Sequence, residues 1–157
     1  ALFSSIADID PSDNVILSWT LSPEHICAKY EAAAPPLNSR VNSVKNALER
    51  GWQVRLCFDP VLLVDNWLDI YTEFFQELFQ NIKGADIRDV TLGVFRMNKD
   101  YFNKIRKRET RSDIYFKDYA IEEGTVVVES KVREIAMNEI EDLLNKFISK
   151  DKILVWK

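Results

Sequence analysis

The sequence predicts an α/β fold in which strands alternate with helices. Apolar runs of strand length occupy residues 15–21, 52–58 and 89–97, and segments with apolar side chains at helical spacing separate them. Successive strands start about 35 to 40 residues apart, which leaves room for a crossover helix and implies parallel pairing with right-handed connections. With 157 residues, 46% of them hydrophobic and 29% charged, the chain has the size and composition of one globular unit.

The first third of the chain predicts a strand followed by two helices. Residues 1–5 (ALFSS) are expected to be the end of a strand, and no turn or cap precedes them, so we expect the chain to start inside a larger fold. Ser22 is the predicted N-cap of a helix over 24–34, which two prolines end. A second helix is predicted over 39–50.

The rest of the chain adds an aromatic helix, a hairpin and a final helix and strand. Aromatic and aliphatic side chains recur at helical spacing over 66–82 and predict a helix buried in the core. The order of the later elements is a helix over 99–108 capped by Asn98, a hairpin turning at 122–124, a helix over 130–149 and a strand over 152–157.

The bulk composition excludes several classes of protein. A formal charge of −4 with only four glycines and five prolines argues against a disordered or low-complexity chain, and weakly against a general nucleic-acid coat. No apolar run approaches the roughly 20 residues that span a bilayer, and the start lacks the pattern of a signal peptide, so we expect a cytoplasmic protein. Cys27, Cys57 and His25 do not stand at metal-ligand spacing, and we expect no metal site and two reduced thiols.

Polar residues stand where the predicted strands end. Parallel sheets bind ligands beyond the carboxyl ends of their strands. The residues at these ends are Ser4, Ser5, Ser18, Thr20, Asp59 and Arg96. Ser18 and Thr20 flank Trp19 and therefore share one face of their strand, which fits the interior of a barrel.

Several of these residues have a second interpretation. Asp59 precedes Pro60, which is predicted to end the strand, and its carboxylate is either part of a site or a turn residue that bonds to backbone amides. Cys57 is a packing residue or a reactive thiol. The basic run Lys104–Arg111 is a phosphate-binding segment or the solvated face of a helix. His25 is a surface residue or a base without a partner.

Three stretches resemble the C-terminal half of the spore photoproduct lyase family, which are radical S-adenosylmethionine enzymes of DNA repair. They are VILSWTLSPEHICAKYEAAAPPLNSRVNSVKNALERGW, QVRLCFDPVLLVDNWLDIY and TLGVFRMNKDYFNKIRKR. The resemblance covers residues 1–108, and the hairpin, helix and strand over 109–157 follow the family order less specifically. It implies the C-terminal portion of a partial (β/α) barrel of the radical S-adenosylmethionine type, forming a single domain or fragment over 1–157.

The resemblance implies cofactors for the complete protein and none for this chain alone. Family members hold a 4Fe–4S cluster on three closely spaced cysteines, whereas Cys27 and Cys57 are 30 positions apart. The implied partner is therefore a cluster-bearing N-terminal half of the barrel, without which the chain is expected to be inactive. DNA is a further implied partner, although Glu122 and Glu123 make the hairpin acidic where the family hairpin is basic.

The resemblance also assigns cofactor-binding residues. Ser18 matches a serine that contacts S-adenosylmethionine, Asp59 stands before the family proline near the same cofactor, and Thr20 shares the face of Ser18. Ser5 falls where the family often has a lysine that pairs with the cofactor carboxylate. The alternative is a non-catalytic α/β module that binds a small ligand or a protein. In either case exposed sheet edges are expected to favour self-association.

Overall fold

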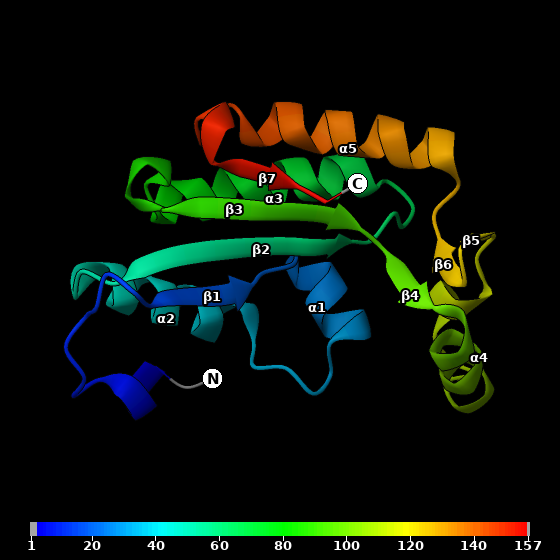
Figure 1. Cartoon of the computed structure of the whole chain (residues 1–157), viewed down its shortest axis with the longest axis horizontal. Coiled ribbons are helices and arrows are strands. Elements are labelled where there is room, and N and C mark those ends of the chain that lie inside the picture. Colours follow the sequence, from blue (N-terminus) through cyan, green and yellow to red (C-terminus); the bar gives the residue numbers. More distant parts are fainter. Residues whose placement is uncertain (1–2, 157) are drawn as a thin grey trace.

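The computed structural model describes residues 3–156, which form a four-stranded parallel sheet and a three-stranded antiparallel sheet (Figure 1). The main sheet has the order β1-β2-β3-β7. Its strands are β1 (Ile16–Thr20), β2 (Gln53–Val61), β3 (Asp89–Val94) and β7 (Ile153–Val155). Each neighbouring pair is parallel, which confirms the predicted α/β class and the parallel pairing.

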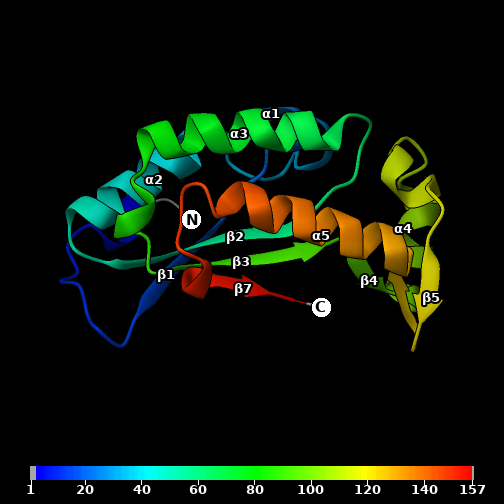
Figure 2. The ribbon, with the colours of Figure 1, turned by 90° about the horizontal axis from the view of Figure 1, so that it is seen from above.

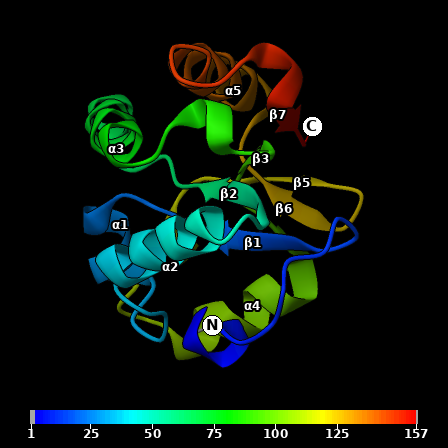
Figure 3. The ribbon, with the colours of Figure 1, turned by 90° about the vertical axis from the view of Figure 1, so that its left-hand side faces the viewer.

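Helices cover one face of the main sheet, and the opposite face has no helix along it within residues 3–156 (Figures 2 and 3). The covering helices are α2 (Leu37–Glu49), α3 (Trp67–Asn81) and α5 (Ser130–Leu144). Side chains of a strand alternate between the two faces. In β2, Val54, Leu56 and Phe58 are therefore buried in the core beneath the helices.

The aromatic stripe of α3 fills this core, as predicted. Phe58 of β2 meets Phe74 and Phe75 edge-on, with ring centroids 6.0 and 5.0 Å apart. Pairs with this geometry add about 0.5–1.5 kcal/mol each beyond the burial of their area. Phe79 of α3 stacks on Phe147, which follows α5, with centroids 4.9 Å apart, so aromatic contacts also join the two helices.

A second, smaller unit stands at the carboxyl ends of the main strands (Figure 1). Its elements are β4 (Arg96–Asn98), α4 (Lys99–Arg108), β5 (Ala120–Glu122) and β6 (Thr125–Val127), and α1 (Glu24–Tyr30) packs against it. Glu123 and Gly124 join β5 to β6 with φ of 47° and 78°. The predicted hairpin is confirmed, and its turn has the positive φ values that a two-residue hairpin of this type requires.

Short 3-10 helices complete the structure. They are η1 (Phe3–Ile6), η2 (Gly84–Asp86), η3 (Asp113–Phe116) and η4 (Lys150–Lys152). The predicted strand over residues 1–5 is wrong, because its described part belongs to η1. Residues 1 and 2 of this predicted strand lie outside the described residues, and so does residue 157 of the predicted final strand. Among the described residues, no helix combines the length and the apolarity needed to cross a bilayer.

The predicted strand over 89–97 is two strands in different sheets. β3 ends at Val94, and Phe95 is buried against Phe102 and Tyr119 of the second unit, with ring centroids 6.3 and 5.1 Å away. Burial of this ring turns the chain out of the main sheet into β4. An uninterrupted apolar run does not show where such a change of sheet occurs.

The predicted N-cap at Ser22 is also wrong. Pro23 occupies that position without a side-chain hydrogen bond, and the Ser22 hydroxyl donates to Oε1 of Glu31 at 2.6 Å instead. Oε2 of Glu31 lies 2.7 Å from Nη1 of Arg40, which also donates to the carbonyl of Thr20 at 3.0 Å. This buried polar cluster, rather than a cap, fixes the turn from β1 into α1. α1 ends at Tyr30 instead of extending to residue 34.

Candidate functional site

The carboxyl ends of the parallel strands meet at one edge of the main sheet, beside the second unit (Figure 1). Ligands of parallel sheets bind at this edge. The face of the main sheet that points away from the helices is here called the uncovered face. The strand register defines which side chains lie on it. They are Ile16, Ser18, Thr20, Gln53, Arg55, Cys57, Asp59, Asp89, Thr91, Gly93 and Leu154.

Ser18 and Thr20 both lie exposed on the uncovered face of β1. Trp19 between them is half-buried and packs against the core. In the register, Ser18 lies opposite Arg55 and Thr20 lies opposite Cys57. The structure therefore brings the two predicted hydroxyls together on one face and adds a guanidinium and a thiol from β2 beside them.

Asp59 stands at the carboxyl edge in a bulge of β2. Contrary to the prediction, Pro60 does not end the strand, because β2 continues to Val61. The register shifts instead: Phe58 pairs with Leu92 and Val61 pairs with Val94, so β2 holds one more residue than β3 between these pairs. A bulge accommodates proline in a strand because no ladder hydrogen bond is then needed from its missing N–H. The Asp59–Pro60 peptide bond is cis.

The Asp59 carboxylate forms a two-point ion pair with Arg96, the first residue of β4. Nη1 of Arg96 donates to Oδ1 at 2.9 Å, and Nη2 donates to Oδ2 at 2.8 Å. These bonds raise the pKa of the Arg96 guanidinium above its ordinary value. The side chains retain 22% exposure for Asp59 and 42% for Arg96, so the pair lies at the rim of the site and is open to solvent.

Gly93 makes room for this ion pair. A Cβ atom at this position would lie 2.7 Å from Nη1 of Arg96 and 3.0 Å from Oδ1 of Asp59. Both distances are shorter than ordinary van der Waals contacts, so either side chain of the pair would have to move. The sequence predicts Asp59 and Arg96 at strand ends, but it reveals neither their contact nor the need for glycine between them.

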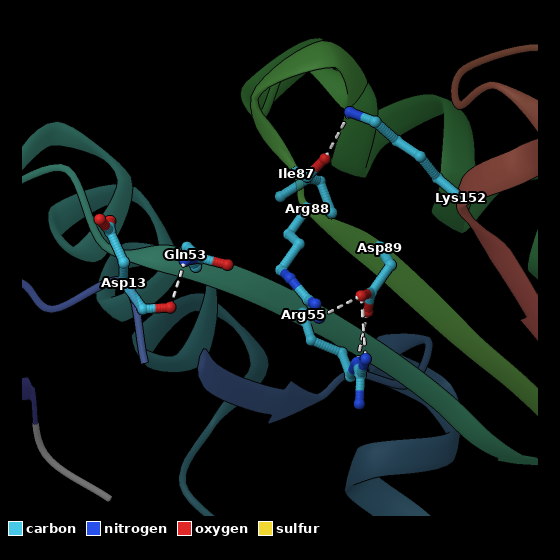
Figure 4. A network of polar contacts seen from close by, with 7 residues as sticks. All are labelled: Asp13, Gln53, Arg55, Ile87, Arg88, Asp89 and Lys152. Carbon is cyan, nitrogen blue, oxygen red and sulfur yellow. Dashed lines mark hydrogen bonds and ion pairs between the residues drawn. The ribbon is translucent and has the colours of Figure 1, made fainter. Parts of the chain in front are cut away.

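A second ionic network lies on the same face toward the start of β2 and β3 (Figure 4). Arg55 and Asp89 are register partners on these strands, and Nη2 of Arg55 donates to Oδ2 of Asp89 at 2.9 Å. Nε of Arg55 donates to the other oxygen, and Nη1 of Arg88 donates to Oδ2 at 2.6 Å. Two guanidinium groups on one buried carboxylate leave a net positive charge on this part of the face. The bond to Asp89 raises the pKa of Arg55.

A groove of about 650 Å³ opens between the carboxyl end of β3 and the β5–β6 hairpin. Its lining combines apolar side chains with Arg96, Arg133, Glu122, Glu123 and Trp156. Arg133 of α5 donates to Oε2 of Glu122 at 3.2 Å and to the carbonyl of Val128 at 3.3 Å, which ties the hairpin to α5. The groove therefore offers two guanidiniums and an exposed indole beside the Asp59–Arg96 pair.

The two cysteines have different surroundings and do not form a metal site. Cys57 is half-buried on the uncovered face, whereas Cys27 is buried in α1. Burial raises the pKa of the Cys27 thiol, although Nη2 of Arg40 donates to its sulfur at 2.8 Å. Residues 3–156 contain no group of three or more His, Cys, Asp or Glu side chains that could hold a metal ion. The donors among these residues do not fit an iron–sulfur cluster.

Comparisons with known proteins agree on one family. A family model described as spore photoproduct lyase matches residues 3–129. A curated spore photoproduct lyase from Geobacillus sp. (strain Y412MC61) is 23% identical over 90 residues, which are 57% of this chain and 26% of that protein.

Solved structures of spore photoproduct lyase have a similar fold. One cysteine-to-alanine mutant superposes with a TM-score of 0.74 at 16% identity, over 89% of this chain and 43% of that one. A double mutant with bound AdoMet and dinucleoside spore photoproduct gives the same values. A complex with dinucleoside spore photoproduct gives a TM-score of 0.72 at 17% identity, over 89% and 43%. The chain spans less than half the length of these relatives.

Proposed function

Because the chain belongs to the spore photoproduct lyase family, we propose that it supplies the C-terminal part of a radical S-adenosylmethionine lyase that acts on thymine photoproducts in DNA. The family match over residues 3–129 is the observation that carries this proposal. A parallel sheet with helices on one face is also what half of a (β/α) barrel requires, because the other face becomes the barrel interior. Residues 1–108 then form barrel units, and 109–157 add the hairpin, helix and closing strand.

In this proposal, S-adenosylmethionine contacts Ser18, Thr20 and Asp59. The two hydroxyls are exposed on the uncovered face and can accept or donate hydrogen bonds. Arg96 already donates to both oxygens of Asp59, and each oxygen keeps a second lone pair for the amino group of the cofactor. The cofactor supplies radical chemistry when a cluster reduces it, while these side chains hold and orient it.

The cluster has to be held by residues other than those described. Cys27 is buried and hydrogen-bonded, and Cys57 stands without other cysteines at ligand spacing. We therefore propose that the chain works together with a cluster-bearing part and is inactive without it. Reading the coding sequence upstream of Ala1 for three closely spaced cysteines tests this step, and their absence there and from adjacent genes would contradict it.

The second candidate is a non-catalytic module that binds a small ligand or a protein. Leu154 and Trp156 near the outer edge of the sheet favour it, because both are exposed and offer apolar surface to a partner. The parallel edge strand β7 beside them could also pair with another chain. A monomer in light scattering at micromolar concentration would argue against self-association through this surface.

Cofactor binding distinguishes the two candidates. In the protein reconstituted with a cluster-bearing part, Ser18→Ala combined with Asp59→Ala should weaken S-adenosylmethionine binding by roughly tenfold or more, since two hydrogen bonds of about 1 kcal/mol or more are lost. Ser149→Ala combined with Asp142→Ala is the matched control, because both residues are exposed and lack side-chain bonds within the described chain. Unchanged calorimetric affinity in the first variant would show that the site is elsewhere.

A further inference from the structure

α4 and the turn after it carry a concentration of positive charge that the proposed site does not use. Residues 99–111 contain six lysines and arginines against Asp100 and Glu109, a net charge of +4. The whole chain has −4, so the remaining residues carry −8. This segment is therefore strongly basic within an acidic protein. We call the side chains of Lys104, Lys107, Arg108 and Arg111 the basic surface.

The structure holds α4 so that these side chains face solvent. Asn98 caps the helix, accepting hydrogen bonds from the amides of Asp100 and Tyr101 at 3.0 and 3.2 Å. Phe102 anchors α4 to the second unit, since it is buried and its ring packs against Tyr119 with centroids 5.7 Å apart. Residues that are four positions apart in a helix lie on the same face. Lys104 and Arg108 therefore lie together on the side away from Phe102.

The charges of the basic surface are unpaired within residues 3–156. No ion pair or side-chain hydrogen bond there involves Lys104, Lys107, Arg108 or Arg111, whereas the ion pairs that do form use residues outside this segment. Arg106 is different, because its guanidinium packs 5.0 Å from the ring centroid of Phe116. Clustered like charges repel one another and lower the stability of a helix. An anionic partner would remove that cost.

The chemistry of α4 favours nucleic acid over a membrane as this partner. An interfacial membrane helix presents a broad apolar face to the lipid, but the exposed side of α4 is polar apart from Tyr101, which is 58% exposed. Lys104 and Arg108 lie about 6 Å apart along the helix, at 1.5 Å per residue. That distance is close to two rises of one strand at roughly 3.4 Å per nucleotide, so both side chains can reach phosphates of the same strand.

α4 is connected through the hairpin turn to the groove beside the Asp59–Arg96 pair. The amide of Lys99, its first residue, donates to the carbonyl of Gly124 in the hairpin turn at 2.9 Å. The hairpin lines the groove beside Asp59 and Arg96, and its own Glu122 and Glu123 repel phosphate. We propose that the basic surface binds the phosphate backbone of DNA next to the lesion, in place of the acidic hairpin. This inference rests on the proposed function.

The test measures binding of a short undamaged duplex by fluorescence anisotropy at several salt concentrations. The variant Lys104→Gln/Lys107→Gln/Arg108→Gln should lower the slope of log K against log salt by about two to three, at roughly 0.9 for each phosphate that is no longer neutralised. The control Lys83→Gln/Lys131→Gln/Lys146→Gln changes three exposed lysines elsewhere by the same charge and should leave the slope unchanged. Circular dichroism checks that both variants are folded.

The outcomes separate this inference from the proposed function. Equal losses in both variants would show a general charge effect, and an unchanged slope in the α4 variant would show that DNA does not touch α4; either result overturns the inference. If the α4 variant loses binding to anionic lipid vesicles but not to DNA, the surface binds membranes and the inference is also wrong. If the basic surface binds undamaged duplex but the protein combined with a cluster-bearing part does not consume the photoproduct, phosphate binding by α4 stands and the proposed function fails.

Discussion

The Asp59–Arg96 ion pair at the carboxyl edge of the sheet leads to a quantitative prediction. Asp59→Ala, Arg96→Ala and the double variant form a cycle that isolates the energy of the pair from the other effects of each substitution. Urea unfolding followed by tryptophan fluorescence gives the free energy of unfolding of each protein. The geometry is favourable, with two nearly parallel N–H···O bonds of 2.9 and 2.8 Å.

Partial exposure of the two side chains limits the coupling energy that we expect for the Asp59–Arg96 pair. Exposed pairs contribute roughly 0.2–1 kcal/mol, and a two-point arginine–carboxylate geometry lies at the upper end of this range. With 22% and 42% of the two side chains exposed, we expect a coupling energy of about 1 kcal/mol at low salt. It should fall in 1 M salt, where the screening length is about 3 Å.

Gly93→Ala provides the structural control for this cycle. The added Cβ would lie 2.7 Å from Nη1 of Arg96, so the pair should separate and the coupling should fall toward zero in this background. A coupling below about 0.3 kcal/mol with glycine present is within the error of additivity and would refute the ion pair. A coupling that survives unchanged in the alanine background would refute the role given to Gly93.

Three further predictions concern the rest of the fold. The backbone amide of Leu62 is buried and donates to the Tyr71 hydroxyl at 3.0 Å. Tyr71→Phe removes this acceptor and should lower the free energy of unfolding, measured by urea titration, by about 1–3 kcal/mol. A smaller change would mean that water replaces the hydroxyl. The raised pKa of Cys27 should make its alkylation by iodoacetamide slow at pH 8, as peptide mass spectrometry would show. The hydrogen bond from Lys29 lowers the pKa of Asp113. The difference in melting temperature between wild type and Asp113→Asn should therefore be present above pH 3.8 and disappear as the pH falls below that value. A difference in melting temperature that stays constant with pH would contradict this role of Lys29.

The order of elements could be predicted from the sequence because each has a strong local signal. The apolar alternation of β2, the aromatic stripe of α3 and the Glu123–Gly124 turn all depend on residues close together in the chain. The short segment at residues 3–6 defeats such a prediction because four apolar and polar residues fit a strand or a single helical turn equally well. Its contact with the core, through buried Phe3, is not a local property.

The candidate site could be predicted only in part. Alternation along the strand predicted that Ser18 and Thr20 share one face, and strand polarity predicted that Asp59 lies at the carboxyl edge; the structure has both features. The partner of Asp59 depends on where β3 gives way to β4, and that point is set by burial of Phe95 in a cluster formed by distant residues. Predicting the Arg55–Asp89 pair likewise requires the register between β2 and β3, which cannot be read from a single sequence.

Turnover of the photoproduct tests the proposed function most directly. The protein would be combined with a cluster-bearing part, supplied with reductant and S-adenosylmethionine, and incubated with dinucleoside spore photoproduct, whose disappearance is followed by chromatography. We predict that the photoproduct is consumed, and that Ser18→Ala with Asp59→Ala slows its consumption whereas Ser149→Ala with Asp142→Ala does not. Intact photoproduct in the presence of a reduced cluster and bound cofactor would contradict the assignment of this chain to photoproduct repair.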